Sequence, residues 1–384
     1  MILTAVLAFA LQTGPVFDEN TSISELTSLA ESEIVEAQAE LSMRLYFQLM
    51  EQGNGPDSAI LAEETLYWAE QAAENGDASM LNQLGILAQS GVAQPVDYVR
   101  AESFYRRAIE AGDRPAIINM ALMFSEDGNP ENDVEAFGLL EPIYTNESPA
   151  EPAVRRVAAA ALGALLTYGL GEVEQDYDRA FALLSFADQG EEAGPQTLFL
   201  IGRYHETGVG GAEGGEATAL RYFERAAQSG HGRAAWKAGM QHLNGWGTEV
   251  DQTAAFYWIR HAAELNDERG IISTAVMYAL GQGVAIDYAQ SRYWYDQAAS
   301  FGNAHAIRAI GMMDVVGQGG PVNLPLGTAL LEMAREAGDQ NAMTLLEQFE
   351  IPDDASFRLS VRESRANWLA ERNLTEDDIY GGQQ

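Results

Sequence analysis

The stretch Ala275–Gly302, AVMYALGQGVAIDYAQSRYWYDQAASFG, contains two helical patterns separated by a glycine-rich turn. Ala275 and Tyr278 share one face of the first predicted helix, which ends at the glycines of GQG. Asp287 has the residue type and position of an N-cap for the second helix. Gly302 follows that helix at a position that favours left-handed backbone. One such hairpin cannot bury its own apolar faces, so it requires neighbouring copies.

The chain contains these copies at spacings of 36 to 42 residues. Each copy is anchored on a small residue in the middle of its first helix, and a glycine follows most anchors six residues later. The anchors are Gly85, Ala121, Gly163, Gly202, Gly239, Ala275 and Gly311. A fixed period of this length is the signature of a repeat architecture, in which each unit packs only on its neighbours.

The ends of the second helices also recur. The capping acids are Asp97, Asp133, Asp176, Asp251 and Asp287. The terminating residues are Gly112, Gly190, Gly230, Asn266, Gly302 and Gly338. Asparagine is the next best residue after glycine in left-handed backbone, so Asn266 fits the same role.

This pattern resembles the Sel-1-like repeat, a longer relative of the tetratricopeptide repeat. The family core, Leu-Gly-x-x-Tyr-x-x-Gly-x-Gly-Val followed by Asp, Ala and Ala-Ala-x-x-Gly, is matched best by Ala275–Gly302 and by 201–230. The resemblance covers about 80–342, with a degenerate copy at 41–76 and the weakest copy around Ala121. It implies an all-α, right-handed solenoid of about eight helix-turn-helix repeats.

We therefore divide the chain into four parts. Residues 1–17 are a candidate signal peptide and leader, and 18–76 hold N-terminal helices and the degenerate first repeat. The solenoid occupies 77–345, and 346–384 form a C-terminal capping helix with a frayed tail. We expect one continuous helix over 22–50 and another over about 356–372.

The first ten residues, MILTAVLAFA, have the length and apolar character of a signal peptide core, and they end in a small-x-small pattern. No Lys or Arg precedes Arg44, however, so the basic n-region of a signal is missing. We expect a periplasmic or secreted protein; the alternative is a disordered start on a cytoplasmic protein.

The 384-residue chain has 22 Lys and Arg against 57 Asp and Glu, a net charge of −35. A surface this negative repels phosphate backbones and anionic membranes, so nucleic-acid binding is excluded as a function class. It is typical of a solvated acidic exterior, or alternatively of a field that steers a cationic partner. The chain has no cysteine, which excludes disulfides and a thiol nucleophile.

Residue patterns for catalysis, metals or cofactors are missing from the sequence. His205 and His242 occupy a position where the repeat prefers Tyr, which indicates packed rings rather than ligands. The run GVGGAEGG lacks both the third glycine of a dinucleotide fingerprint and the Gly-Lys-Ser/Thr of a phosphate loop. The acidic stretch that begins at Asp127 has Asn132 where a calcium loop needs glycine. We expect no metal and no cofactor.

The remaining candidate is a helix surface. Positions −3, +1 and +4 from each anchor form a second stripe on the first helices, and the family resemblance implies that similar positions line a concave face. In the last four repeats this stripe is rich in aromatic, Met and aliphatic residues and includes two arginines. The candidate binding residues are Phe199, Arg203, Trp236, Met240, Leu243, Ile272, Val276, Arg308 and Met312. The alternative interpretation is packing between successive repeats.

Two function classes stay open. The first, implied by the family resemblance, is a monomeric, non-enzymatic scaffold that binds peptide or protein segments. The second is a cell-wall-related hydrolase, or a regulator of one, whose catalytic residues are scattered across repeats. An open groove would favour the scaffold, and a deep pocket with converging carboxylates or histidines would favour the enzyme.

Overall fold

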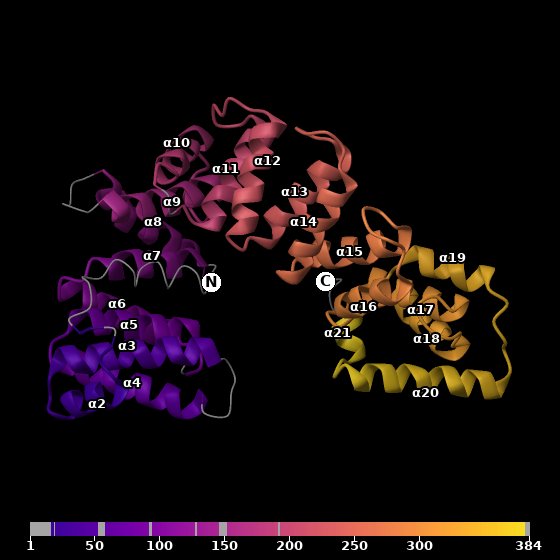
Figure 1. Cartoon of the computed structure of the whole chain (residues 1–384), viewed down its shortest axis with the longest axis horizontal. Helices are drawn as coiled ribbons and strands as arrows, with labels where there is room; N and C mark the ends of the chain where they lie inside the picture. The colour runs from indigo at the N-terminus through magenta and orange to yellow at the C-terminus, as the bar shows by residue number, and fades with distance from the viewer. Residues whose placement is uncertain are drawn as a thin grey trace. The chain divides into compact units, whose positions relative to one another are not determined.

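The computed structural model describes residues 17–18, 20–52, 58–91, 94–126, 129–145, 152–190 and 193–380. All regular secondary structure within these ranges is α-helical, which confirms the predicted all-α class. The candidate signal segment lies outside the described residues, except for Phe17. The helices follow one another as antiparallel pairs (Figure 1).

The chain divides into two compact units, 1–193 and 194–384. The helices of the first unit are α2 (Ile23–Glu31), α3 (Val35–Gln52), α4 (Ser58–Glu74), α5 (Ala78–Ser90), α6 (Tyr98–Glu110), α7 (Pro115–Glu126), α8 (Pro130–Tyr144), α9 (Pro152–Tyr168) and α10 (Tyr177–Ala187). Those of the second unit are α11 (Pro195–Thr207), α12 (Glu216–Gln228), α13 (Gly232–Asn244), α14 (Gln252–Glu264), α15 (Glu268–Leu280), α16 (Tyr288–Ala299), α17 (Ala304–Val316), α18 (Leu324–Glu336), α19 (Gln340–Gln348), α20 (Ala355–Glu371) and α21 (Glu376–Tyr380).

Eight helix pairs form the repeats of the described chain, from α3–α4 to α17–α18. We call the first helix of each pair its A helix and the second its B helix. In the α15–α16 repeat, Gly281 ends the A helix with a φ of 70°. The Asp287 carboxylate caps the B helix by accepting the backbone N–H groups of Ala289 and Gln290. These local interactions agree with those predicted from the sequence.

The terminating residues mostly adopt the predicted left-handed backbone. Asn266 has a φ of 60°, so it replaces glycine as expected. Gly190 is an exception, because α10 ends at Ala187 and the φ of Gly190 lies outside the left-handed region. The predicted cap at Asp133 is also wrong. Pro130 favours the first helical position, so α8 starts earlier, with Asn129 as its cap.

The anchor residues are small because the A and B helices of one repeat touch there. A Cβ on Gly239 would lie 3.0 Å from the backbone oxygen of Ala255 in α14. A Cβ on Gly202 would lie 2.7 Å from the ring of Phe223 in α12. Ala275 occupies the equivalent place and is fully buried. A larger side chain at the anchor would therefore separate the pair.

The second glycine of the turn has a different role, since it brings successive repeats together. Gly247, Gly283 and Gly319 have φ values of 73°, 69° and 72°. A Cβ on Gly283 would overlap the backbone oxygen of Gln252, the first residue of the preceding B helix, and lie 2.6 Å from its carbonyl carbon. A Cβ on Gly247 would overlap the backbone at the start of α12, and one on Gly319 would lie 2.5 Å from the backbone oxygen of Tyr288 at the start of α16. Both the backbone conformation and the close approach require glycine.

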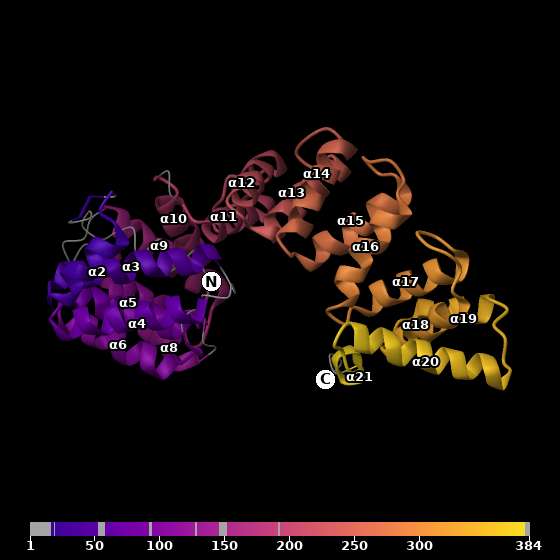
Figure 2. The ribbon, with the colours of Figure 1, turned by 60° about the horizontal axis from the view of Figure 1, so that its bottom comes forward.

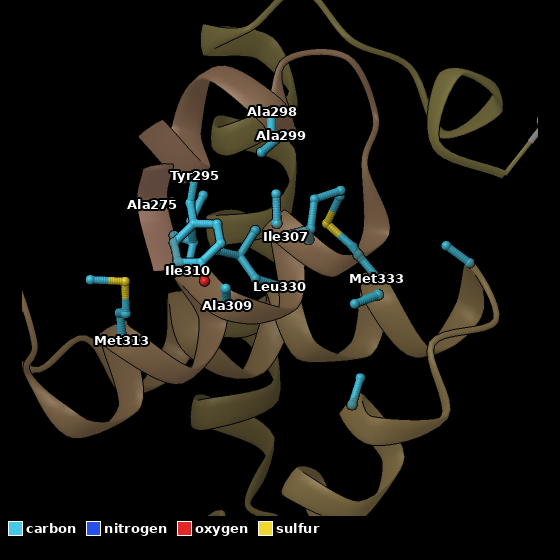
Figure 3. Packing of buried hydrophobic residues seen from close by; sticks show 14 of the residues in the cluster. Ala275, Tyr295, Ala298, Ala299, Ile307, Ala309, Ile310, Met313, Leu330 and Met333 are labelled. Carbon is cyan, nitrogen blue, oxygen red and sulfur yellow. The ribbon is translucent and has the colours of Figure 1, made fainter. Parts of the chain in front are cut away.

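The core of the second unit extends across repeats. Figure 3 shows Tyr295, Ile310 and Leu330 packed against one another, and they come from α16, α17 and α18. Trp368 of α20 and Ile379 of α21 belong to the same cluster. Figure 2 shows α20 alongside α18, where it covers the end of the helix array.

Two expectations at the ends of the chain are wrong. The single helix expected over 22–50 is divided into α2 and α3, and Glu33 between them has a φ of 61°. Residues 376–380 form α21 instead of a frayed tail. The Tyr380 hydroxyl donates a 2.8 Å hydrogen bond to Glu336 of α18, which holds this last helix in place.

Candidate functional site

The A helices of the second unit have one face buried and one face open to solvent. Positions −1 and 0 from each anchor are fully packed, as at Ile201 and Ala238. Positions −3, +1 and +4 lie between about 40° and 100° around the helix from the anchor, at 100° per residue. In α13, α15 and α17 these positions are half-buried. These positions are the candidate binding surface that was predicted from the sequence.

The apolar members of this stripe remain partly exposed across three repeats. We define the A-helix strip as Trp236, Met240, Leu243, Ile272, Val276, Leu280 and Met312; all are half-buried except Leu280, which is 61% exposed. Phe199 occupies the −3 position of α11 but is only 3% exposed. The His231 ring stacks on the Phe199 ring with 4.3 Å between their centroids, so Phe199 is covered and adds no exposed surface to the strip.

Trp236 joins two repeats. Its ring packs against the cluster of Ala255, Ile259 and Met277. Its indole N–H donates a 3.2 Å hydrogen bond to the Ser273 hydroxyl of α15. The side chain therefore contributes to packing between repeats and still presents part of its ring to solvent.

The two arginines of the predicted stripe differ in their surroundings. Arg308 is largely buried and pairs with Asp339 at 2.8 Å, and its Nη2 lies 2.7 Å from His305 Nδ1. Arg203 is exposed. Within the described ranges, the Arg203 guanidinium makes no hydrogen bond or ion pair.

Three further residues on the same face were missed by the sequence analysis. Arg233 and Arg269 lie at position −6, seven residues before the +1 position, so they share its side of the helix. Leu280 lies at position +5, beyond the end of the stripe that we followed. Extending the register by one helical turn at each end would have found all three.

Three of the histidines have structural contacts. His242 Nε2 contacts Glu224 at 2.9 Å, and His205 stacks on Tyr222 at 5.4 Å. The His231 ring caps α13 by accepting the N–H of Ala234, and burial lowers the pKa of His231. Its Nε2–H then donates to Gln196. Each ring thus has a packing or capping role.

In the first unit, an open hollow about 640 Å³ in volume lies beside the α9–α10 turn. Its acids include Glu174, Asp176 and Asp178, but Asp176 is committed to capping α10. In the part of the chain that the structure describes, no three His, Asp or Glu side chains gather as they would around a metal ion. The suspected calcium loop begins at residues 127–128, which lie outside the described residues.

Successive antiparallel helix pairs define an α-helical repeat solenoid. The chain belongs to the Sel1 repeat family: the Sel1 repeat model matches residues 35–77, 78–113, 156–187, 195–231, 232–267, 272–303 and 304–339, more than half of the chain. Residues 114–155 are not matched, although α7 and α8 form the usual pair there. They include the copy around Ala121 that was identified as the weakest.

A solved Sel1 repeat protein from Oxalobacter formigenes is similar, with 22% identity over 89% of this chain and 98% of that chain, at a TM-score of 0.54. The protein c5321, a protective antigen present in uropathogenic Escherichia coli strains displaying an SLR fold, is 17% identical over 95% of this chain and 97% of that chain, at a TM-score of 0.39. The first of these likenesses supports the fold. No match to a curated protein was found. None of the described helices is both long and apolar enough to span a bilayer.

Proposed function

We propose that this Sel1 repeat protein is an interaction scaffold whose A-helix strip binds a segment of a partner protein. The observation that carries the proposal is the partial exposure of Trp236, Met240, Val276 and Leu280 on neighbouring helices of one unit. Solvent-facing apolar residues that continue from helix to helix are typical of interaction sites, whereas single ones are common on any surface.

The composition of the strip suits protein recognition. Binding centres are enriched in aromatic residues, Met and Arg, and Trp236 and Met240 lie side by side one helical turn apart. The flexible Met side chains adapt to irregular apolar surfaces. The strip is held by the core beneath it, because Trp236 packs against Ile259 and Met277. A preorganised surface of this kind loses little conformational entropy on binding.

The hydrolase hypothesis has no comparable support. The carboxylates near the strip are used elsewhere, since Glu206 pairs with Lys237 at 2.8 Å and Asp339 pairs with Arg308. Hydrolysis by general acid and base requires two groups that converge on one bond. The described residues do not bring such a pair together on this face.

The test uses two matched variants as baits for affinity capture from the native cell. Leu280→Asp places a charge on the strip, at a side chain that is 61% exposed. Tyr257→Asp places the same charge on B helix α14, at a side chain that is 62% exposed. We expect Leu280→Asp to lose specific partners that the unmodified chain and Tyr257→Asp both retain. Equal capture by all three baits would contradict the proposal.

A further inference from the structure

The A helices of the second unit differ in charge from the rest of the protein. Helices α11, α13, α15 and α17 contain five basic and three acidic residues, so this layer is about +2, whereas the whole chain is −35. The basic residues are Arg203, Arg233, Lys237, Arg269 and Arg308, and the acidic ones are Glu206, Glu268 and Asp314. Positive charge is therefore concentrated beside the A-helix strip.

The acids of this layer are already occupied. Glu206 pairs with Lys237, and Asp314 is buried against Arg292 at 2.7 Å. Glu268 accepts a 2.6 Å hydrogen bond from the Asn303 side chain. Within the described residues none of these three acids forms an ion pair with Arg203, Arg233 or Arg269, although Glu268 keeps its negative charge because its partner is a neutral amide.

Three of the arginines are available. Arg203, Arg233 and Arg269 are exposed, and within the described ranges none of their guanidinium groups makes a hydrogen bond or ion pair. Most other cations of the second unit are paired; Arg292 and Arg308 are examples. These unpaired arginines are available to carboxylates of another molecule.

Two of these arginines repeat with the period of the fold. Arg233 lies over the Phe199 ring at 5.9 Å, and Arg269 lies over the Trp236 ring at 5.3 Å. Each arginine therefore lies within cation–π distance of the aromatic residue at position −3 of the preceding A helix. A cation–π contact uses none of the guanidinium N–H donors, so their fork is available to a carboxylate.

We propose that Arg233 and Arg269 bind the carboxylates of an acidic segment of the partner protein, while its apolar side chains contact the A-helix strip. This inference rests on the proposed function and names the chemistry of the partner. Packed helices lie about 8–10 Å apart, and three residues of a polyproline II segment span about this distance at about 3.1 Å each, with side chains i and i+3 on the same side. The matching segment carries acids three residues apart with apolar residues between them.

The charge of the whole chain selects a short acidic segment over a polyanion. Nucleic acid carries a charge on every phosphate and would be repelled by the acidic remainder of the protein. A segment with two or three carboxylates meets the local positive charge and avoids most of that repulsion, because screening limits interactions beyond about 10 Å.

The experiment selects binders to the full chain from a library of random peptides about twelve residues long, a length that can cross several helices. We expect the selected peptides to be enriched in Asp or Glu three residues apart. The double variant Arg233→Glu/Arg269→Glu should bind the selected peptides at least about tenfold more weakly, equivalent to about 1.4 kcal/mol.

The control variant is Arg221→Glu/Arg362→Glu, which changes the net charge equally at exposed sites on α12 and α20. It should change the affinity less than about twofold, about 0.4 kcal/mol. This inference would be overturned if the selected peptides were not enriched in acidic residues. It would also be overturned if the Arg233→Glu/Arg269→Glu variant bound acidic peptides as tightly as the unmodified chain does. The proposed function would survive if Leu280→Asp still abolished their binding. Failure to select any peptide would count against both.

Discussion

Replacing Gly283 by alanine tests how the second turn glycine joins successive repeats. The added Cβ would overlap the backbone oxygen of Gln252 and lie 2.6 Å from its carbonyl carbon. Left-handed backbone costs a residue with a Cβ about 1–2 kcal/mol. Relieving the overlap requires the two repeats to move apart, and overpacking of this kind costs about 1–3 kcal/mol. We therefore expect Gly283→Ala to lower the free energy of unfolding by about 2–5 kcal/mol.

Gly211→Ala is the matched control. Gly211 has the same φ of 69°, and nothing lies within 4 Å of the position that its Cβ would take. Gly211→Ala should lower the free energy of unfolding only by the cost of left-handed backbone, about 1–2 kcal/mol. The difference between the variants isolates the close approach between repeats.

The measurement is urea denaturation followed by circular dichroism, together with hydrogen exchange. Neighbouring repeats are coupled through their interfaces, so the loss should appear as faster exchange in α14 and α15. If the two variants lose the same stability within about 0.5 kcal/mol, the reasoning fails, since that is the range of neutral surface changes.

Three further predictions follow from the structure and the sequence. Trp236→Ala should lower the free energy of unfolding by about 1–3 kcal/mol, which is less than the loss for a fully buried ring, because the indole is half-exposed. Chemical denaturation measures this loss, with Trp246→Ala as the control. A loss above about 4 kcal/mol would identify Trp236 as a core residue. Burial raises the pKa of the Asp113 carboxyl to about 6, so this group stabilises the fold most below about pH 4 and the contribution is lost as the pH rises through 6. Asp113→Asn retains an oxygen to cap Ala116 and should flatten the dependence of the melting temperature between pH 4 and 7; an unchanged slope would refute it. Finally, if residues 1–10 are a signal, mass spectrometry of the protein from its native host should find a start near Leu11, whereas a retained Met1 would contradict export.

The repeat register was determined by the sequence alone. Asp287, Gly281 and Asn266 occupy the cap and left-handed positions that the pattern predicted. These assignments succeeded because each residue type meets a requirement of its own backbone, and that requirement acts over only a few residues. The same locality explains why α7 and α8 form a normal pair although the family model does not match them.

Two local features were predicted wrongly from the sequence. The turn between α2 and α3 places Glu33, rather than glycine, in left-handed backbone. The first residues of α8 were set by Asn129 and Pro130, which displaced the expected cap from Asp133. In both places packing or a competing helix start overrode the usual residue preference.

Exposure within the candidate site was decided only by the tertiary structure. Phe199 and Trp236 occupy equivalent positions, yet His231 covers the first and the second stays half-open. Arg308 is neutralised by Asp339, 31 residues further along, while Arg269 lies over the Trp236 ring and makes no ion pair within the described residues. The physical reason is that burial and charge pairing depend on side chains supplied by the next repeat, whereas caps and turns depend on the residues beside them in the chain.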